Sequence, residues 1–312
     1  MFDPNGQAGF VSGYDGFLAQ LRDRQFLRRE MNVFRSFPLL LIDEQPVAIL
    51  DLLFLSELLS QGVYWTIFDA LPSTNRRRFK ELWGKAFERY VGALFAHYYP
   101  PPSRILSMDI PYAGGQVDAM LDFGSLVILL EIKSSLLTES AKRSGVRDTL
   151  LADIERKYVR TEDGEAKGVL QLANACAAIR DGRLRTSYEQ PRIYPVVLTD
   201  EVCAEAPGFN SYLNTKFFEV LSDQRGIKPL TVMSVGEVEE ILPYIAAAQL
   251  TWEALFDRRF TPDGKGLLIH SVHQTLYDLS HTQGTPVLRN EFVLHRFENV
   301  YAHIKQVFQA PE

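Results

Sequence analysis

The sequence has few cysteines and no recognisable leader segment. Its two cysteines, Cys176 and Cys203, have no metal-type spacing, so neither a disulfide scaffold nor a zinc site is expected. The first residues, MFDP, lack both the basic start and the apolar run of a signal peptide. These absences predict a cytoplasmic protein.

A membrane-spanning segment is not expected either. The run Ile49–Leu59, ILDLLFLSELL, is strongly apolar but only eleven residues long, and Asp51 interrupts it. A helix that crosses a bilayer needs about 20 apolar residues. We therefore interpret this run as a buried helix and expect no membrane partner.

The motifs of several enzyme classes are also missing. There is no Walker loop, no GxGxxG and no GxSxG, so nucleotide hydrolysis and serine-hydrolase chemistry have no support. The net charge is −6 and the isoelectric point is near 5.6, which does not suggest a general nucleic-acid binder. Contacts with phosphate would then depend on local basic groups.

The most informative segment is Gln116–Lys133, QVDAMLDFGSLVILLEIK. It predicts two strands joined by a tight turn at DFGS, and the apolar run LVILL is typical of a strand buried on both faces. Asp118 lies on the first strand, and Glu131 and Lys133 end the second. Because side chains alternate along a strand, Glu131 and Lys133 share a face while Ile132 points into the core.

These residue types suit a divalent-metal site. Magnesium is usually held by one or two carboxylates together with other oxygens, here Asp118, Glu131 and the Ile132 carbonyl. Lys133 could orient or deprotonate the attacking water, or stabilise charge on a phosphate. Acidic residues and lysines at strand ends are nevertheless common, and the spacing D-x12-E-x-K alone would match many unrelated chains.

A second acidic residue lies on a long amphipathic helix predicted over Arg78–Tyr99. Glu88 has a glycine four residues before it and another four residues after it, on one line of the helix surface. This line could pack closely against the sheet and bring Glu88 to the site. Alternatively, Glu88 pairs with Lys85 or Arg89 on an ordinary solvated face.

Together these residues resemble the PD-(D/E)XK nuclease superfamily, which has the restriction-endonuclease-like fold. The resemblance covers residues 78–235 and implies an αβββαβ core. Glu88 corresponds to the helical acid, an accessory metal ligand, Asp118 to the motif aspartate, and Glu131 and Lys133 to the E-x-K pair. It implies Mg²⁺ or Mn²⁺ as the cofactor and DNA as the substrate.

One departure from the superfamily pattern is Val117, which stands where many members have proline before the aspartate. The resemblance also adds Gln171, because several branches have a glutamine bordering the active site on the equivalent helix. Its alternative reading is a plain polar residue on a helix surface.

The expected fold class is α/β, with a mixed central sheet flanked by helices and helical extensions at both ends. The expected divisions are a mainly helical extension over residues 1–75, the nuclease-like core over 76–242, and a helical extension packed on the core over 243–312. The later elements expected are helices at 147–160, 167–180 and 212–222 and strands at 192–198 and 230–235.

Two functions remain open at this point. The first is a metal-dependent endodeoxyribonuclease, which the resemblance associates with phage defence, restriction or DNA repair. Its expected partners are DNA and either a second copy of the chain or a protein of a defence or repair complex. The second is a catalytically silent protein of the same fold that serves as a nucleic-acid-binding or assembly subunit.

Overall fold

The computed structural model describes residues 11–13, 39–41, 47–49, 52, 55, 61–201, 206–221, 225–260, 270–282 and 284–309. By its internal contacts the chain divides into two compact units, Met1–Leu82 and Trp83–Glu312. The boundary falls inside helix α5 (Ser73–Tyr98). The divisions expected at residues 75 and 242 stay predictions.

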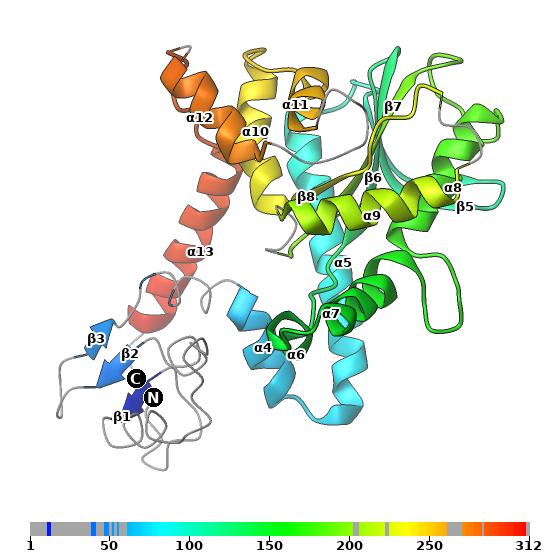
Figure 1. Ribbon diagram of the computed structural model, residues 1–312. Coiled ribbons are helices and arrows are strands. Elements are labelled where there is room, and N and C mark those ends of the chain that lie inside the picture. Colours follow the sequence, from blue (N-terminus) through cyan, green and yellow to red (C-terminus); the bar gives the residue numbers. More distant parts are fainter. Residues whose placement is uncertain are drawn as a thin grey trace. The chain divides into compact units, whose positions relative to one another are not determined.

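A five-stranded sheet forms the centre of the second unit (Figure 1). In spatial order its strands are β4 (Leu106–Tyr112), β5 (Gly115–Asp122), β6 (Leu126–Lys133), β7 (Arg192–Thr199) and β8 (Thr231–Ser234). The first three strands pair antiparallel, and β6, β7 and β8 pair parallel. The α/β class with a mixed central sheet is therefore confirmed.

Helices cover both faces of this sheet (Figure 1). One face packs against α8 (Gly168–Arg180) and α9 (Pro207–Glu219), and the other against α5, α10 (Val235–Ala246), α11 (Trp252–Arg259) and α12 (Val272–Thr282). Along β6, Val127 and Leu129 join the first core cluster, whereas Ile128 and Leu130 join the second. Two buried faces explain why the run LVILL has no polar alternation.

The remaining helices of this unit are α6 (Glu139–Arg143), α7 (Arg147–Ile154) and α13 (Glu291–Gln309). The helix expected over 147–160 is α7 followed by a π-helical turn, η1 (Glu155–Val159). The helix expected from residue 212 begins earlier, at Pro207, because proline at the first helical position has its φ already set and loses no hydrogen bond.

The described part of the first unit contains α4 (Gln61–Ala70) and a small sheet of β1 (Val11–Gly13), β2 (Leu39–Leu41) and β3 (Val47–Ile49). The sequence predicted a buried helix from Ile49, and this is wrong at its start. Ile49 pairs with Leu39 as the last residue of β3 and is 51% exposed, because strand pairing removes it from the helix. Much of the run after it lies outside the described residues.

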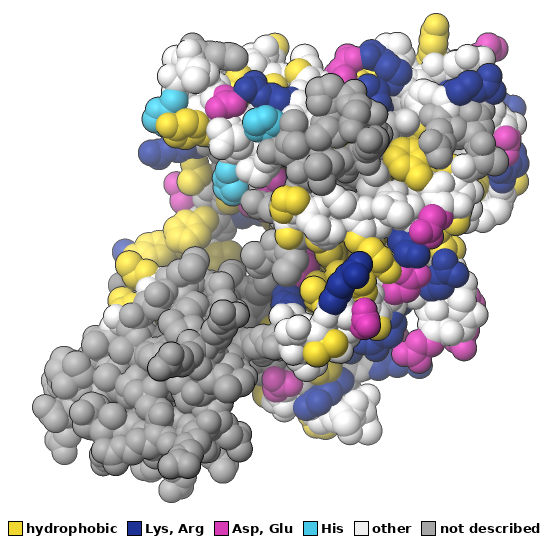
Figure 2. All heavy atoms as spheres, in the orientation of Figure 1, with side chains coloured by type: hydrophobic (Ala, Val, Ile, Leu, Met, Phe, Trp, Pro, Cys, Tyr) yellow, Lys and Arg dark blue, Asp and Glu magenta, His cyan; other side chains and the backbone are white. Residues whose placement is uncertain are grey.

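The surface of the described part is mixed in charge. In Figure 2, Lys and Arg side chains are interspersed with Asp and Glu side chains, in keeping with the net charge of −6. Within the same described residues, no helix has the length and apolar character needed to cross a membrane.

Candidate functional site

The candidate site lies where β5 and β6 diverge. Backbone pairing between the two strands runs as far as Ala119 and Leu130 and ends there. Beyond that point, Asp118 Oδ2 accepts a hydrogen bond from the Ile132 amide at 2.7 Å. The Asp118 side chain thus replaces a backbone acceptor, and Oδ1 is the oxygen that it can offer to a ligand.

Glu131 and Lys133 form a close ion pair at the end of β6. Lys133 Nζ lies 2.5 Å from Glu131 Oε1, whereas Ile132 packs into the core cluster on the α5 face of the sheet. Glu131 is only 1% exposed, and its Oε2 has no hydrogen-bond partner. A buried carboxylate oxygen without a partner is costly, so this atom fits a site that takes up a cation.

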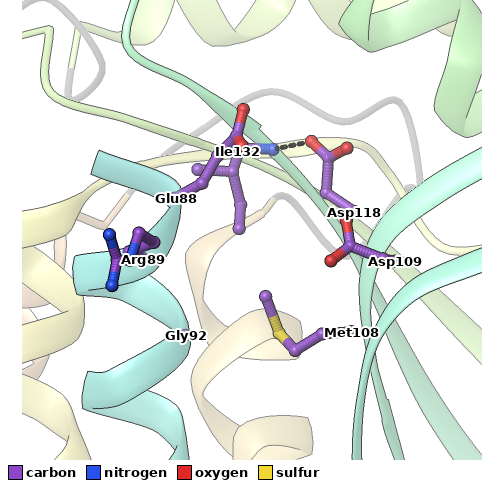
Figure 3. A pocket seen from close by; sticks show the side chains of 7 residues that line it. All are labelled: Glu88, Arg89, Gly92, Met108, Asp109, Asp118 and Ile132. Atoms are coloured by element: carbon purple, nitrogen blue, oxygen red, sulfur yellow. Dashed lines mark hydrogen bonds between the residues drawn. The ribbon is translucent and has the colours of Figure 1, made fainter. Parts of the chain in front are cut away.

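A pocket of about 220 Å³ lies between α5 and the strands, and Asp118 is on its wall. It is lined by Glu88, Arg89, Gly92, Met108, Asp109, Asp118 and Ile132. In Figure 3, Glu88 and Arg89 extend from α5 on one side, and Asp109 and Asp118 come from the strands on the other. A Cβ on Gly92 would lie 3.3 Å from Met108 Cε, so the glycine allows α5 to approach β4 closely.

Asp109 is a pocket carboxylate that no sequence pattern predicted. The β4–β5 register pairs Met108 with Ala119 and Ile110 with Val117, which places Asp109 opposite Asp118. Asp109 has a φ of +51°, a left-handed conformation that aspartate tolerates better than most residues. Nothing in the spacing of the sequence marks this residue, because only the pairing of β4 with β5 brings it to the pocket.

The electrostatics reflect this concentration of carboxylates. Burial raises the pKa of the Glu131 carboxyl to about 7; the Lys133 ammonium opposes this shift, and the negative charges of Asp118 and Glu88 add to it. Burial also raises the pKa of Glu88, with further contributions from the charges of Asp118 and Asp109. Acidic groups that are harder to ionise than usual gain most from a nearby cation.

The residue types present fit a hard divalent cation such as Mg²⁺ or Mn²⁺, which prefers carboxylate, carbonyl and water oxygens. Across the described residues, no three or more His, Cys, Asp or Glu side chains gather closely enough to hold a metal ion by themselves. A site here would therefore rely on Asp118 and Glu131 together with non-side-chain oxygens. Magnesium is often held in this way.

Gln171 does not line the pocket. It lies half-buried on α8, and its proposed supporting role stays a prediction. The same helix approaches the site through Gly168, where a Cβ would lie 3.3 Å from Lys133 Cε. The sequence shows a glycine at the first position of this helix. Only the position of Lys133 in the structure explains why a larger residue would not fit there.

This chain has little similarity to known proteins. No protein family and no curated protein matches this chain. Among solved structures it has a likeness to Pyrococcus furiosus SfsA in complex with Ca²⁺, with 15% sequence identity and a TM-score of 0.22. The match covers 49% of this chain and 56% of the other, so it spans about half of each protein. A likeness this weak carries no conclusion about the site.

Proposed function

We propose that this protein is a divalent-metal-dependent nuclease that hydrolyses phosphodiester bonds in DNA. The observation that carries the proposal is Glu131, a buried carboxylate with one oxygen paired to Lys133 and the other without a partner. The charges of Asp118 and Glu88 act on this carboxyl. Carboxylates with a nearby lysine are a donor set that suits metal-assisted phosphodiester hydrolysis.

The roles follow from the contacts of each residue. Asp118 Oδ1, Glu131 Oε2 and the Ile132 carbonyl would hold the cation, and Glu88 would support them from α5. When bound, the cation would activate the attacking water and offset the negative charge of the phosphate. Lys133 would orient the water and stabilise the charge that develops on the phosphate during attack.

Two cations near the pocket suit the DNA backbone. Arg89 lines the pocket, and Lys85 lies one helical turn before it on α5. Both side chains are exposed, and within the described part of the chain neither has an ion-pair partner within 4.0 Å. Residues spaced four apart on a helix are neighbours, so the pair could contact successive phosphates of one strand.

A specific observation favours the second candidate function, a catalytically silent nuclease-fold protein that binds nucleic acid or assembles with a partner. Neither Glu131 nor Lys133 lines the pocket that Asp118 and Glu88 share. In that case Glu131 and Lys133 would take no part in a reaction, and the protein would bind nucleic acid without cutting it.

A cleavage assay separates the two functions. Plasmid and linear DNA are incubated with the protein in Mg²⁺, in Mn²⁺ and in EDTA, beside Asp118→Ala and Lys133→Ala. Asp163→Ala, in an exposed turn before α8, is the matched control for loss of a carboxylate. We expect cutting that requires metal, is abolished in the two site variants and is unchanged in the control.

The other outcomes are equally informative. Cutting that survives both site substitutions would mean that the chemistry lies elsewhere. If neither metal gives cutting while the protein still retains DNA, the silent binding function is supported instead. Nicked or linearised plasmid would identify an endonuclease.

A further inference from the structure

In the loop that follows Lys133, the backbone of each residue from Ser135 to Thr138 is hydrogen-bonded to a side chain from another part of the chain. Tyr158 Oη donates to the Ser135 carbonyl at 2.7 Å, and Lys157 Nζ donates to the Leu136 carbonyl. The next two backbone amides are bound in the same way. Leu137 N donates to Glu201 Oε2 at 2.7 Å, and Thr138 N donates to Asp153 Oδ2 at 2.8 Å.

Tyr158 contacts the chain on two sides of Lys133. Besides its bond to the Ser135 carbonyl, its hydroxyl lies 3.0 Å from Thr199 Oγ1. Thr199 is the residue paired with Lys133 between β6 and β7. One buried hydroxyl therefore connects the residue two positions after Lys133 with the residue beside it on the neighbouring strand.

The Tyr158 carbonyl oxygen and the Lys133 side chain both lie close to the α-carbon of Gly168. A Cβ on Gly168 would be 3.1 Å from the Tyr158 carbonyl oxygen, 3.3 Å from Lys133 Cε and 3.7 Å from Lys133 Cγ. The methylenes of Lys133 thus pass over the bare Cα of Gly168, beside Tyr158. This path leads the ammonium to Glu131 Oε1, 2.5 Å away.

Tyr158 belongs to η1, the π-helical turn between α7 and α8. Such turns are rare and occur frequently at functional sites, because the extra residue redirects the side chains around it. Here Tyr158 is fully buried, and its ring meets Phe209 edge to face at 5.3 Å. The ring packing fixes the hydroxyl that holds the loop.

We propose that Tyr158 is the positioning residue for Lys133, holding the end of β6 and the following loop so that the ammonium points at Glu131. The effect of Tyr158 on the rate of cleavage rests on the proposed nuclease function, but its effect on the position of the Lys133 ammonium does not. The Tyr158 hydroxyl holds the Ser135 carbonyl and Thr199. The Tyr158 carbonyl confines the space above Gly168 through which the Lys133 side chain passes.

The first test is Tyr158→Phe, which removes one oxygen and keeps the ring. We expect the kcat for DNA cleavage to fall about 10- to 100-fold with KM unchanged, because a small displacement of a reacting group costs that much. Tyr212→Phe is the matched control, since Tyr212 donates to Glu155 Oε2 at 2.6 Å in the same turn without touching the loop. A kcat within twofold of wild type in Tyr158→Phe, or an equal fall in both variants, would overturn the proposal.

A second readout does not depend on cleavage. Trace acetylation of Lys133 by acetic anhydride, measured by mass spectrometry against Lys216, reports how firmly its ammonium is held. We expect a several-fold rise in Tyr158→Phe and none in Tyr212→Phe. If the wild type cuts no DNA, the nuclease function fails while this rise still supports positioning; unchanged labelling would reject positioning alone.

Gly168→Ala provides a variant in which Tyr158 stays intact. Its methyl group would lie 3.1 Å from the Tyr158 carbonyl oxygen and 3.3 Å from Lys133 Cε, so it would press on both groups. We expect the same loss of kcat and the same rise in labelling. Gly236→Ala is its control, because that glycine is also in the first turn of a helix and its Cβ would meet nothing closer than Ser234 Oγ at 3.8 Å. If Gly168→Ala keeps the wild-type labelling of Lys133 and the wild-type kcat, the close approach of Lys133 to Gly168 does not position the ammonium.

Discussion

Asp109 lies opposite Asp118 across β4 and β5, and both carboxylates line the same pocket. Two acids that face each other on neighbouring strands repel when no cation lies between them. A cation that offsets the negative charge of these two carboxylates would therefore stabilise the pairing of β4 with β5.

This repulsion gives a first prediction. We expect Asp109→Asn to raise the free energy of unfolding in EDTA by roughly 0.2–1 kcal/mol, since it removes one of two like charges on opposing strands. The same substitution should reduce the stabilisation that Mg²⁺ provides. Thermal unfolding with and without Mg²⁺ measures both effects. A variant that is less stable in EDTA, with the full Mg²⁺ response, would show that the Asp109 and Asp118 carboxylates do not repel each other.

The raised pKa of Glu131 gives a pH prediction. Because the folded-state pKa of about 7 exceeds the unfolded-state value, the folded protein binds this proton more tightly than the unfolded chain. As the pH rises from the unfolded-state pKa to the folded-state pKa of about 7, ionisation of Glu131 therefore lowers the free energy of unfolding. The total decrease is on the order of 3 kcal/mol. In EDTA, Glu131→Gln should be more stable than wild type at about pH 8 and nearly equal to it at about pH 5. Urea unfolding at both pH values measures the difference, and a difference independent of pH would refute it.

Arg89 and Lys85 should contribute to the salt dependence of DNA binding. Binding is measured as a function of salt concentration in the Lys133→Ala background, in which the proposed function predicts no cleavage. Each lost phosphate contact should reduce the slope of log K against log salt by about one. Arg185→Ala is the control, because Arg185 is exposed in the loop between α8 and β7. An equal slope for Arg89→Ala and the control would exclude Arg89 from the DNA contact.

Arg259 and Glu237 form a buried ion pair outside the site, with Nη1 and Oε1 3.3 Å apart and both side chains fully buried. Arg259→Ala would remove the guanidinium from this buried pair, and breaking a buried ion pair typically costs about 3–5 kcal/mol of unfolding free energy. The neighbouring Arg258→Ala breaks the exposed pair with Asp278 and should cost less than about 1 kcal/mol. Urea denaturation of both variants tests this contrast, and similar losses would mean that burial does not control the cost.

Several features of the fold follow from local patterns. The tight turn predicted at DFGS is one example: Gly124 has a φ of +81°, and its amide donates to Asp122 Oδ1 at 2.8 Å. The apolar run LVILL likewise predicted a strand buried on both faces, because no polar alternation interrupts it. The sequence did not predict the π-helical turn at Glu155–Val159, whose hydrogen-bonding pattern has no distinct apolar period.

In the candidate site, too, local sequence patterns predicted some relationships and tertiary structure decided the others. Strand alternation alone placed Glu131 and Lys133 on one face, since successive side chains of a strand must point to opposite sides. By contrast, Asp109 reaches the pocket only through the register of β4 on β5, and Tyr158 reaches the Lys133 loop only through the packing of η1 on the sheet. Local periodicity thus determined which residues share an element and a face. Tertiary structure alone decided which of them meet, because long-range pairing and packing depend on the whole chain.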